Sequence, residues 1–194
     1  MLRKTELRRT YRARRDAIPL HEREAASDRI RGRVLDLPEL AAARRVFVYV
    51  SAGSEVQTYT LIEALLAAGK TVAVPRITNL DAGQMEAVPI KSLKELVPSP
   101  GPAGTFGLLE PQGGQALEVA PDLTIVPGLA FSPITGVRLG VGGGFYDRYL
   151  TANPDTLPVG LAFNAQLRDT LPAEAHDARL SMIITESHGI SIDL

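Results

Sequence analysis

One short stretch of the chain, residues 136–148 with the sequence GVRLGVGGGFYDR, combines glycines, arginines and an aspartate in the pattern of an anion-binding loop. Three consecutive glycines, Gly142, Gly143 and Gly144, lack Cβ, so the backbone can adopt positive φ and direct successive N–H groups at one anion. A helix predicted to begin near Phe145 would add the positive end of its dipole. The stretch therefore predicts a phosphate-binding loop, and the geometry favours a nucleotide.

Charged residues in this stretch support that interpretation. Arg138 and Arg148 can supply fixed positive charge, and Asp147, about one turn inside the helix, is placed to hold Mg²⁺ beside bound phosphates. The loop matches neither the P-loop pattern nor the spaced glycines of dinucleotide-binding folds. Two simpler interpretations stay open: a flexible surface connection with solvated arginines, and an ordinary acidic residue in the first turn of a helix.

The elements around the loop indicate an α/β fold. An apolar, β-branched run at residues 123–126 ends at Pro127 and Gly128, which predicts a buried strand just before the loop. Open parallel sheets bind ligands beyond the carboxyl ends of their strands. Strand and helix patterns alternate along the chain, so we expect a three-layer fold: a mainly parallel sheet with helices on both faces and the Gly-rich phosphate loop after a central strand.

The predicted elements can be assigned by range. Strands are expected at residues 46–50, 71–74, 123–126, 159–163 and 181–185. Helices are expected at about 3–17, 22–35 and 58–68, and from residue 145 onward. Residues 79–121 are rich in Pro and Gly and have weak periodicity, so only a weak helix near 91–96 and loops at 98–107 and 111–114 are predicted there.

Composition indicates one compact domain. The chain has 194 residues, 45% of them hydrophobic, enough for one substantial core, so we expect a single domain over 1–194 with the helical segment 1–45 packed on it. The absence of cysteine excludes disulfides, thiolate nucleophiles and cysteine-bound zinc. There is no run of 18 apolar residues and the first residues are charged, so we expect a cytoplasmic protein with no membrane association. We also expect a monomer.

Charge is distributed unevenly. Residues 1–45 hold 13 Lys/Arg against 7 Asp/Glu, whereas the whole chain has a formal net charge of −1. This basic segment has few aromatic residues and no nucleic-acid-binding motif, so no nucleic-acid partner is expected and most of its arginines are predicted to form a solvated helix face. Lys4 and Arg8 lie four residues apart on one face of the first predicted helix, so both could reach a triphosphate.

Residues 126–150, VPGLAFSPITGVRLGVGGGFYDRYL, resemble the signature of the 5-formyltetrahydrofolate cyclo-ligase family. The likeness extends along most of the chain. It includes Lys4 and Arg8 at the family's spacing, YVSAGSEVQT at 49–58, VAVPR, VGLAFNAQ, and PAEAHDARLSMIITE near the carboxyl end.

The resemblance implies a reaction and two co-reactants. ATP and 5-formyltetrahydrofolate would give 5,10-methenyltetrahydrofolate, ADP and phosphate, with Mg²⁺ bound beside the phosphates. The formyl oxygen would be phosphorylated, and the nitrogen at position 10 would then close the ring and expel phosphate. Alignment and charge stabilisation suffice for such phosphoryl transfer, which is consistent with the lack of an obvious protein nucleophile.

The resemblance also assigns roles to residues. Lys4 and Arg138 are implied as catalytic residues, and Asp147 and Asp177 as Mg²⁺ ligands. The implied ATP-binding set comprises Lys4, Arg8, Arg138, Leu139, Gly140, Val141, Gly142, Gly143, Gly144, Phe145 and Tyr146. The implied folate-binding set comprises Val50, Glu55 and Tyr146.

Glu55 illustrates what the resemblance adds. By its type and position alone it is an acidic residue near a helix start, although it lies beyond the end of a strand, where such sheets bind ligands. The resemblance implies instead that its carboxylate accepts hydrogen bonds from ring N–H groups of the reduced pterin.

Three positions depart from the family's pattern. Val141 stands where a tyrosine or basic residue is frequent, and Ser132 and Ser181 replace common aspartates. These departures leave the glycines, Arg138 and Glu55 in place but keep two alternatives open. One is a diverged paralogue acting on another formamide-like metabolite, and the other is a non-catalytic nucleotide- or RNA-binding module.

Overall fold

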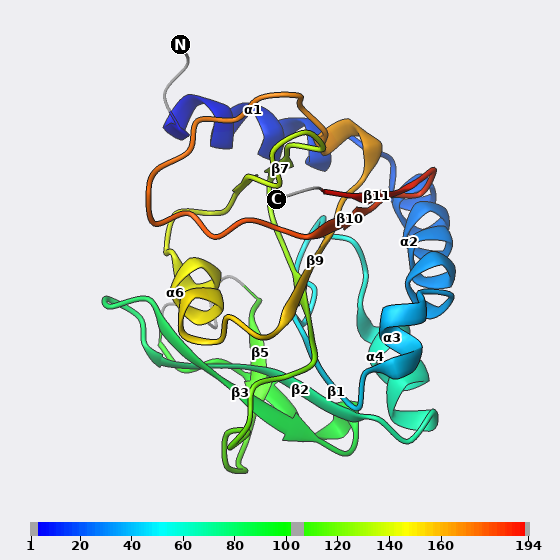
Figure 1. Ribbon diagram of the computed structural model, residues 1–194, viewed down its shortest axis with the longest axis vertical. Helices are drawn as coiled ribbons and strands as arrows, with labels where there is room; N and C mark the ends of the chain where they lie inside the picture. Colours follow the sequence, from blue (N-terminus) through cyan, green and yellow to red (C-terminus); the bar gives the residue numbers. More distant parts are fainter. Residues whose placement is uncertain (1–3, 102–106, 193–194) are drawn as a thin grey trace.

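The computed structural model describes residues 4–101 and 107–192. A seven-stranded sheet with the order β11-β10-β9-β6-β1-β2-β3 forms its centre (Figure 1). The strands are β1 (Arg45–Val48), β2 (Thr71–Asn79), β3 (Gln84–Ile90), β6 (Leu123–Val126), β9 (Leu157–Leu161), β10 (Met182–Ile184) and β11 (Gly189–Ser191). Neighbouring strands from β10 to β2 pair in parallel, whereas β3 and β11 pair antiparallel at the two edges.

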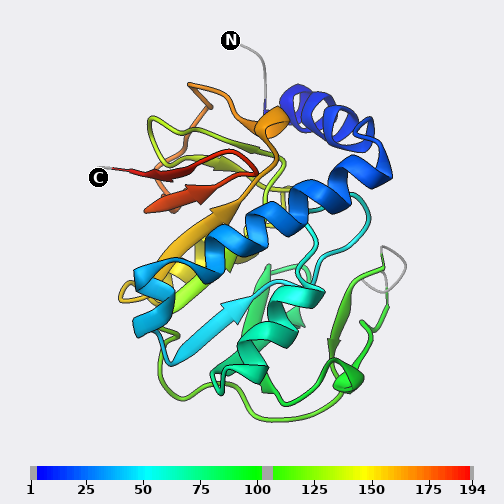
Figure 2. The same ribbon diagram turned by 90° about the vertical axis from the view of Figure 1, so that its right-hand side faces the viewer.

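Helices cover both faces of this sheet (Figures 1 and 2). The helices α2 (Leu20–Leu35), α3 (Pro38–Ala42) and α4 (Tyr59–Ala67) lie on one face, and α6 (Phe145–Ala152) lies on the other. All four residues of β6 are buried, as expected for a strand covered on both sides. The predicted three-layer α/β fold with a mainly parallel sheet is therefore confirmed.

Helix α1 (Lys4–Asp16) lies above the carboxyl ends of the central strands, beside the short 3₁₀ helix η2 (Asn164–Gln166). Leu7 and Tyr11 of α1 are buried in a cluster with Leu129, Leu139 and other apolar residues. This packing places the charged residues of α1 next to the loops that follow β1 and β6. Among the described helices, none combines the length and apolar character that a membrane span requires.

The region between residues 79 and 121 contains more structure than its weak periodicity predicted. It forms the second half of a long β2–β3 hairpin, the 3₁₀ helix η1 (Leu93–Glu95) and a small antiparallel sheet of β4 (Leu96–Pro98) and β5 (Leu109–Pro111). Part of the loop predicted at 98–107, residues 102–106, lies outside the described residues. Helix α3 was also not predicted, because its five residues are too few to show a period.

The glycine loop is reached from central strand β6 through a short hairpin that the sequence did not indicate. Strands β7 (Ala130–Phe131) and β8 (Arg138–Leu139) of this hairpin have only two residues each. The loop therefore follows β8 directly and β6 only indirectly. The hairpin carries the loop over the carboxyl edge of the main sheet, where α6 begins at Phe145 as predicted.

Candidate active site

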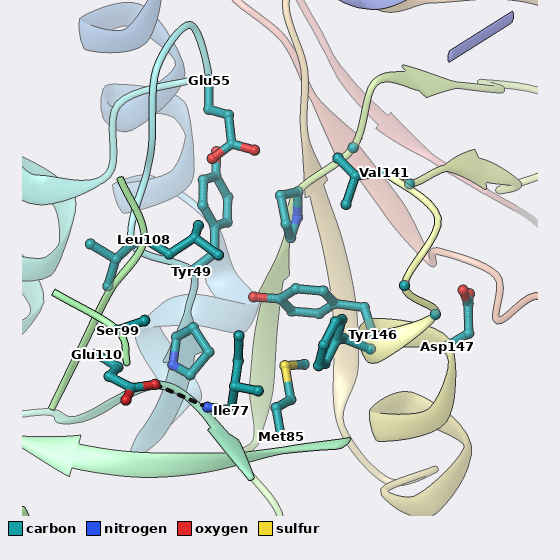
Figure 3. A pocket seen from close by; sticks show the side chains of 18 of the residues that line it. Tyr49, Glu55, Ile77, Met85, Ser99, Leu108, Glu110, Val141, Tyr146 and Asp147 are labelled. Atoms are coloured by element: carbon teal, nitrogen blue, oxygen red, sulfur yellow. Dashed lines mark hydrogen bonds between the residues drawn. The ribbon is translucent and has the colours of Figure 1, made fainter. Parts of the chain in front are cut away.

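A cavity of about 220 Å³ lies between the glycine loop and the β2–β3 and β4–β5 hairpins (Figure 3). Its wall combines residues from four parts of the chain. The segment after β1 supplies Tyr49, Val50 and Glu55, the β2–β3 hairpin supplies Pro75, Ile77 and Met85, and the surroundings of β4 and β5 supply Ser99, Leu108, Leu109 and Glu110. The stretch from the end of β6 through the glycine loop to α6 supplies Pro127, Gly128, Arg138, Gly140, Val141, Gly143, Gly144, Phe145, Tyr146 and Asp147. Most of these side chains are apolar. The cavity thus suits an organic ligand that needs a few polar contacts.

The glycine loop between β8 and α6 has the backbone that its sequence predicted. Gly142 has φ 118° and Gly144 has φ 68°, both in the region that favours glycine. Gly144 is the N-cap of α6, and no side chain caps the helix start. The first N–H groups of α6 are therefore free of side-chain caps and can bind an anion.

Arg8 reaches this loop across more than 130 residues of sequence. Its Nε donates to the carbonyl oxygen of Gly140 at 3.0 Å, and its guanidinium lies beside Gly142. Arg148, predicted to supply fixed positive charge, donates to the carbonyl oxygens of Gly83 and Gly143. Arg148 thus fixes the loop to the β2–β3 turn, while Arg8 covers it from α1.

Arg138 lies on β8 and is not on an exposed loop. Its side chain is 4% exposed, and its Nη2 donates to Asp147 Oδ1 at 2.9 Å while its Nη1 donates to the carbonyl oxygen of Ala178 at 2.9 Å. Burial lowers the pKa of Arg138, although Asp147 opposes this effect. The guanidinium lines the cavity as a buried charge with carboxylate and carbonyl partners.

Asp147 and Asp177 are the two predicted metal ligands, and Asp147 contacts the residue that directly follows Asp177. Asp147 Oδ1 accepts a hydrogen bond from the Ala178 N–H at 3.1 Å in addition to the bond from Arg138. Asp177 Oδ2 accepts from Lys4 Nζ at 2.8 Å and from the Glu174 N–H at 2.7 Å. Each carboxylate is therefore already held in place by a cation and a backbone N–H.

Lys4 forms its closest contacts with acidic residues. It pairs with Asp177 and, at 3.2 Å, with Glu174. Burial lowers the pKa of Lys4, but the two carboxylates outweigh it and the net pKa is raised. Burial raises the pKa of Asp177, but the hydrogen bonds from Lys4 and Glu174 lower it overall. Both groups are thus stabilised in their charged forms.

Glu55 lies at one end of the cavity (Figure 3), in the loop between β1 and α4. Its side chain is 18% exposed, and its Oε2 accepts from the Ala52 N–H at 3.0 Å. Burial raises the pKa of Glu55, partly opposed by the Ala52 N–H and by two arginines of α1. Hydrogen-bond donors of a bound ligand would lower the pKa and favour the carboxylate.

Tyr146 projects its ring into the cavity, and its hydroxyl forms no hydrogen bond with any described residue. The ring stacks on Phe47 with centroids 6.0 Å apart. Burial, together with the nearby Glu55 carboxylate, raises the pKa of Tyr146 well above its ordinary value, so the hydroxyl keeps its proton. This buried hydroxyl is available to donate to a ligand.

The structure places the remaining predicted site residues as follows. Phe145, Val141 and Val50 line the cavity, and Val141 is also 62% exposed at the loop surface. Leu139 is buried beside Leu7 and Tyr11, so only its backbone could contact a ligand.

A family profile described as the 5-formyltetrahydrofolate cyclo-ligase family matches residues 1–186. The chain belongs to the 5-formyltetrahydrofolate cyclo-ligase family. A 5-formyltetrahydrofolate cyclo-ligase of Escherichia coli K12 is 34% identical over 182 residues, covering 91% of this chain and 96% of the relative. A protein of Caenorhabditis elegans named probable 5-formyltetrahydrofolate cyclo-ligase is 30% identical, covering 98% of this chain and 96% of the relative. The predicted family and enzyme class are confirmed.

Solved structures agree with this assignment. The NMR structure of Aquifex aeolicus 5,10-methenyltetrahydrofolate synthetase superposes with a TM-score of 0.83 at 28% identity, covering 97% of this chain and 92% of that one. A synthetase of the same name from Mycoplasma pneumoniae superposes with a TM-score of 0.73 at 20% identity, covering 95% and 99% of the two chains, which shows the shared fold. The cyclo-ligase fold therefore extends over nearly the whole chain.

Two of the three departures from the family's pattern lie away from the cavity. Ser132 is buried in the β7–β8 turn, where its Oγ donates to the Asp169 carbonyl at 2.6 Å and accepts from the Thr135 N–H at 3.1 Å. The backbone N–H of Ser181 donates to the carbonyl of Pro158 in β9. Of the three positions, only Val141 lines the cavity.

Sequence reasoning missed half of the cavity wall. Met85 and Glu110 belong to the region of weak periodicity, and Ile77 lies in β2 just before it. Glu110 is buried, and its Oε2 accepts from the Ile77 N–H at 3.2 Å. Buried and exposed residues do not alternate along β2, so no period of two indicated the hairpin. No sequence signal indicated that β5 would fold back on β2, because that contact depends on tertiary structure.

Proposed function

We propose that this cyclo-ligase converts 5-formyltetrahydrofolate into 5,10-methenyltetrahydrofolate, with ATP as the phosphoryl donor. The observation that carries the proposal is one cavity bounded by the partly buried carboxylate of Glu55 and by a glycine loop with uncapped N–H groups. A carboxylate suits the N–H groups of a reduced pterin, and the loop suits phosphates. The formyl group would then lie between the two subsites.

In the proposed reaction the formyl oxygen takes up the γ-phosphoryl group and ADP leaves. N10 then attacks the formyl carbon and loses its proton, and the C–O bond breaks to release phosphate. The protein supplies alignment and charge. The N–H groups of Gly143, Gly144 and Phe145 would hold phosphate oxygens, while Arg8 and Arg138 would balance negative charge that develops during transfer.

Lys4 would join the phosphate site by exchanging partners. It is paired with Asp177 in this structure, so a bound phosphate group would have to compete for its ammonium. Because Lys4 and Arg8 are one turn apart on α1, the helix can present both to the same triphosphate. We therefore assign both residues to ATP binding.

The residues present fit a Mg²⁺ ion. Asp147 Oδ2 and Asp177 Oδ1 accept no hydrogen bond among the described residues, and hard carboxylate oxygens are the ligands that Mg²⁺ prefers. Asp147 and Asp177 would hold the ion. When bound, Mg²⁺ would neutralise phosphate charge during transfer.

The apolar part of the cavity would hold the pterin and limit access of water. Tyr49, Met85 and Tyr146 form planar or polarisable walls, and the Tyr146 hydroxyl supplies one buried donor. We further propose that the enzyme acts in the cytoplasm as a monomer and without a nucleic-acid partner.

The direct test is an absorbance assay of product formation. The methenyl product has its own absorbance band, so mixing enzyme, 5-formyltetrahydrofolate, ATP and Mg²⁺ should make that band grow. Omission of ATP is the control. A band that grows equally without ATP, or that never grows, would overturn the proposed function.

A further inference from the structure

Arg15 occupies a position on α1 where an apolar residue would be expected. Leu7, Tyr11 and Arg15 follow one another at four-residue spacing, and all three are buried. The other arginines of α1 are exposed or partly exposed, as predicted, but the side chain of Arg15 is only 7% exposed. A buried guanidinium needs specific partners, because its desolvation is otherwise unfavourable.

The partners of Arg15 belong to the two loops that form one end of the cavity. Its Nε donates to Ser54 Oγ at 3.0 Å, and its Nη1 approaches the Gly128 carbonyl at 3.5 Å and Glu55 Oε1 at 3.6 Å. Ser54 Oγ in turn donates to Asp16, the last residue of α1. The guanidinium thus connects α1 with the loop after β1 and the loop after β6.

The surroundings of Glu55 contain few groups that favour its carboxylate form. From α1 these are Arg15 and the exposed Arg12, and from its own loop the Ala52 N–H. Tyr49 of the β1 end, Tyr59 of α4 and Tyr146 of α6 also face it, and all three are neutral. Among the described residues, Arg15 is the cation paired with the Glu55 carboxylate, and with the Ala52 N–H and Arg12 it opposes the burial that favours the protonated form.

We propose that Arg15 is a positioning residue for folate binding, which holds Glu55 ionised and directs its carboxylate into the cavity. The inference rests on the proposed function, since it concerns the carboxylate that would accept from the pterin. Arg15 need not touch the substrate. The same helix carries Arg8 at the glycine loop, so α1 supports both subsites.

The test compares Arg15→Met, Arg15→Lys and, as a matched control on the exposed side of the same helix, Arg9→Met. The readout is kcat/KM for 5-formyltetrahydrofolate at saturating ATP as a function of pH. This profile reports the pKa values of essential groups in the enzyme form to which folate binds. Loss of Arg15 should raise the apparent pKa of the acid limb by about one unit, which lowers kcat/KM about tenfold at pH values below the limb. Arg15→Lys should restore most of the profile, and Arg9→Met should leave it unchanged.

Repeating the Arg15 substitutions in a Glu55→Gln enzyme separates an effect on Glu55 from a folding defect. In enzyme that already carries Glu55→Gln, the Arg15→Lys and Arg15→Met changes should have no further effect on the pH profile, because there is no carboxylate for Arg15 to hold. An unchanged acid limb in Arg15→Met, or equal effects in the two backgrounds, would overturn the role of Arg15 while leaving the proposed function intact. Absence of turnover in the unsubstituted enzyme would overturn both.

Discussion

The ion pair between Arg138 and Asp147 has a structural role in addition to its proposed role with phosphates. Arg138 was expected on an exposed loop or helix start, but its side chain is buried against Asp147 and the Ala178 carbonyl. Removing one member of a buried pair leaves the other charge without compensation. The positions of both side chains therefore affect stability as well as catalysis.

Arg138→Ala should consequently destabilise the protein and abolish turnover. We expect the free energy of unfolding to fall by about 3 kcal/mol. Urea titration measures the change, and Arg9→Ala on the exposed face of α1 is the control. Equal midpoints for the two variants would contradict the buried ion pair.

Glu55 should make folate binding depend on pH. Its pKa is raised by burial, so protonation begins at a higher pH than for an exposed glutamate, and kcat/KM for 5-formyltetrahydrofolate should fall as pH decreases through that pKa. Glu55→Gln should remove this acid limb and raise KM for folate more than KM for ATP. An equal rise in both KM values would argue against the assigned role.

Residue types predicted the parts of the site that depend on backbone conformation. They did not predict the hydrogen-bond partners of charged side chains. Glycines 142 and 144 adopt the positive φ that their types allow, and Arg8 reaches the loop as its spacing suggested. The partners of Arg15 and Arg148 were not predicted, because an arginine's position in the sequence does not show which groups it will contact after folding.

At the scale of elements, the glycine loop depends on positions that only glycine occupies without strain. A Cβ at Gly142 would meet no atom closer than 3.6 Å, but its φ of 118° is unfavourable for other residues. Gly140 has neither a positive φ nor a neighbour within 4 Å of a Cβ, so it is a matched control.

Gly142→Ala should therefore impair ATP use much more than Gly140→Ala. Backbone strain of about 1–2 kcal/mol corresponds to about a tenfold loss in kcat/KM for ATP if the loop must hold this conformation to bind phosphate. Steady-state kinetics at saturating folate measure the difference. Similar values for the two variants would remove the loop from the phosphate site.

The sheet has a separate polar anchor at the opposite ends of its strands. Asp122 Oδ2 accepts from the Arg44 and Arg45 N–H groups, both at 2.8 Å, and Oδ1 accepts from the Arg45 guanidinium at 2.5 Å. Burial would raise the pKa of Asp122, but these hydrogen bonds outweigh it and lower the pKa. Asp122 thus joins the starts of β1 and β6.

Asp122→Ala should lower the free energy of unfolding by about 1–2 kcal/mol at neutral pH through loss of these bonds. Because the folded-state pKa is depressed, this stabilisation is present above the carboxyl's ordinary pKa and disappears as pH falls through the lowered value. Unfolding curves of both proteins as a function of pH should converge in acid. A difference that persists there would contradict the electrostatic origin.

For the whole molecule, period and propensity predicted the parallel sheet because its central strands are buried apolar runs separated by helices. The edge hairpins were missed, since β3, β5 and the β7–β8 turn are defined by the neighbours they pair with. The cavity lies between the glycine loop and the edge hairpins. The side formed by the glycine loop was predicted from the sequence, whereas the side formed by the hairpins was not.

A single domain over 1–194 stays a prediction. Helix α1 packs through Leu7 and Tyr11 and through Arg15 onto the loops of the sheet, so it should unfold together with the core. Far-ultraviolet circular dichroism and tyrosine fluorescence should then report one coincident transition in urea. An early transition confined to helical signal would indicate that the first helices fold separately.

The most direct test of the whole account is a crystal structure with 5-formyltetrahydrofolate and a non-hydrolysable ATP analogue with Mg²⁺. Phosphates should lie on the N–H groups of Gly143, Gly144 and Phe145, the metal on Asp147 and Asp177, and the pterin within hydrogen-bonding distance of Glu55. Nucleotide density away from the glycine loop, or a pterin that does not reach Glu55, would contradict it.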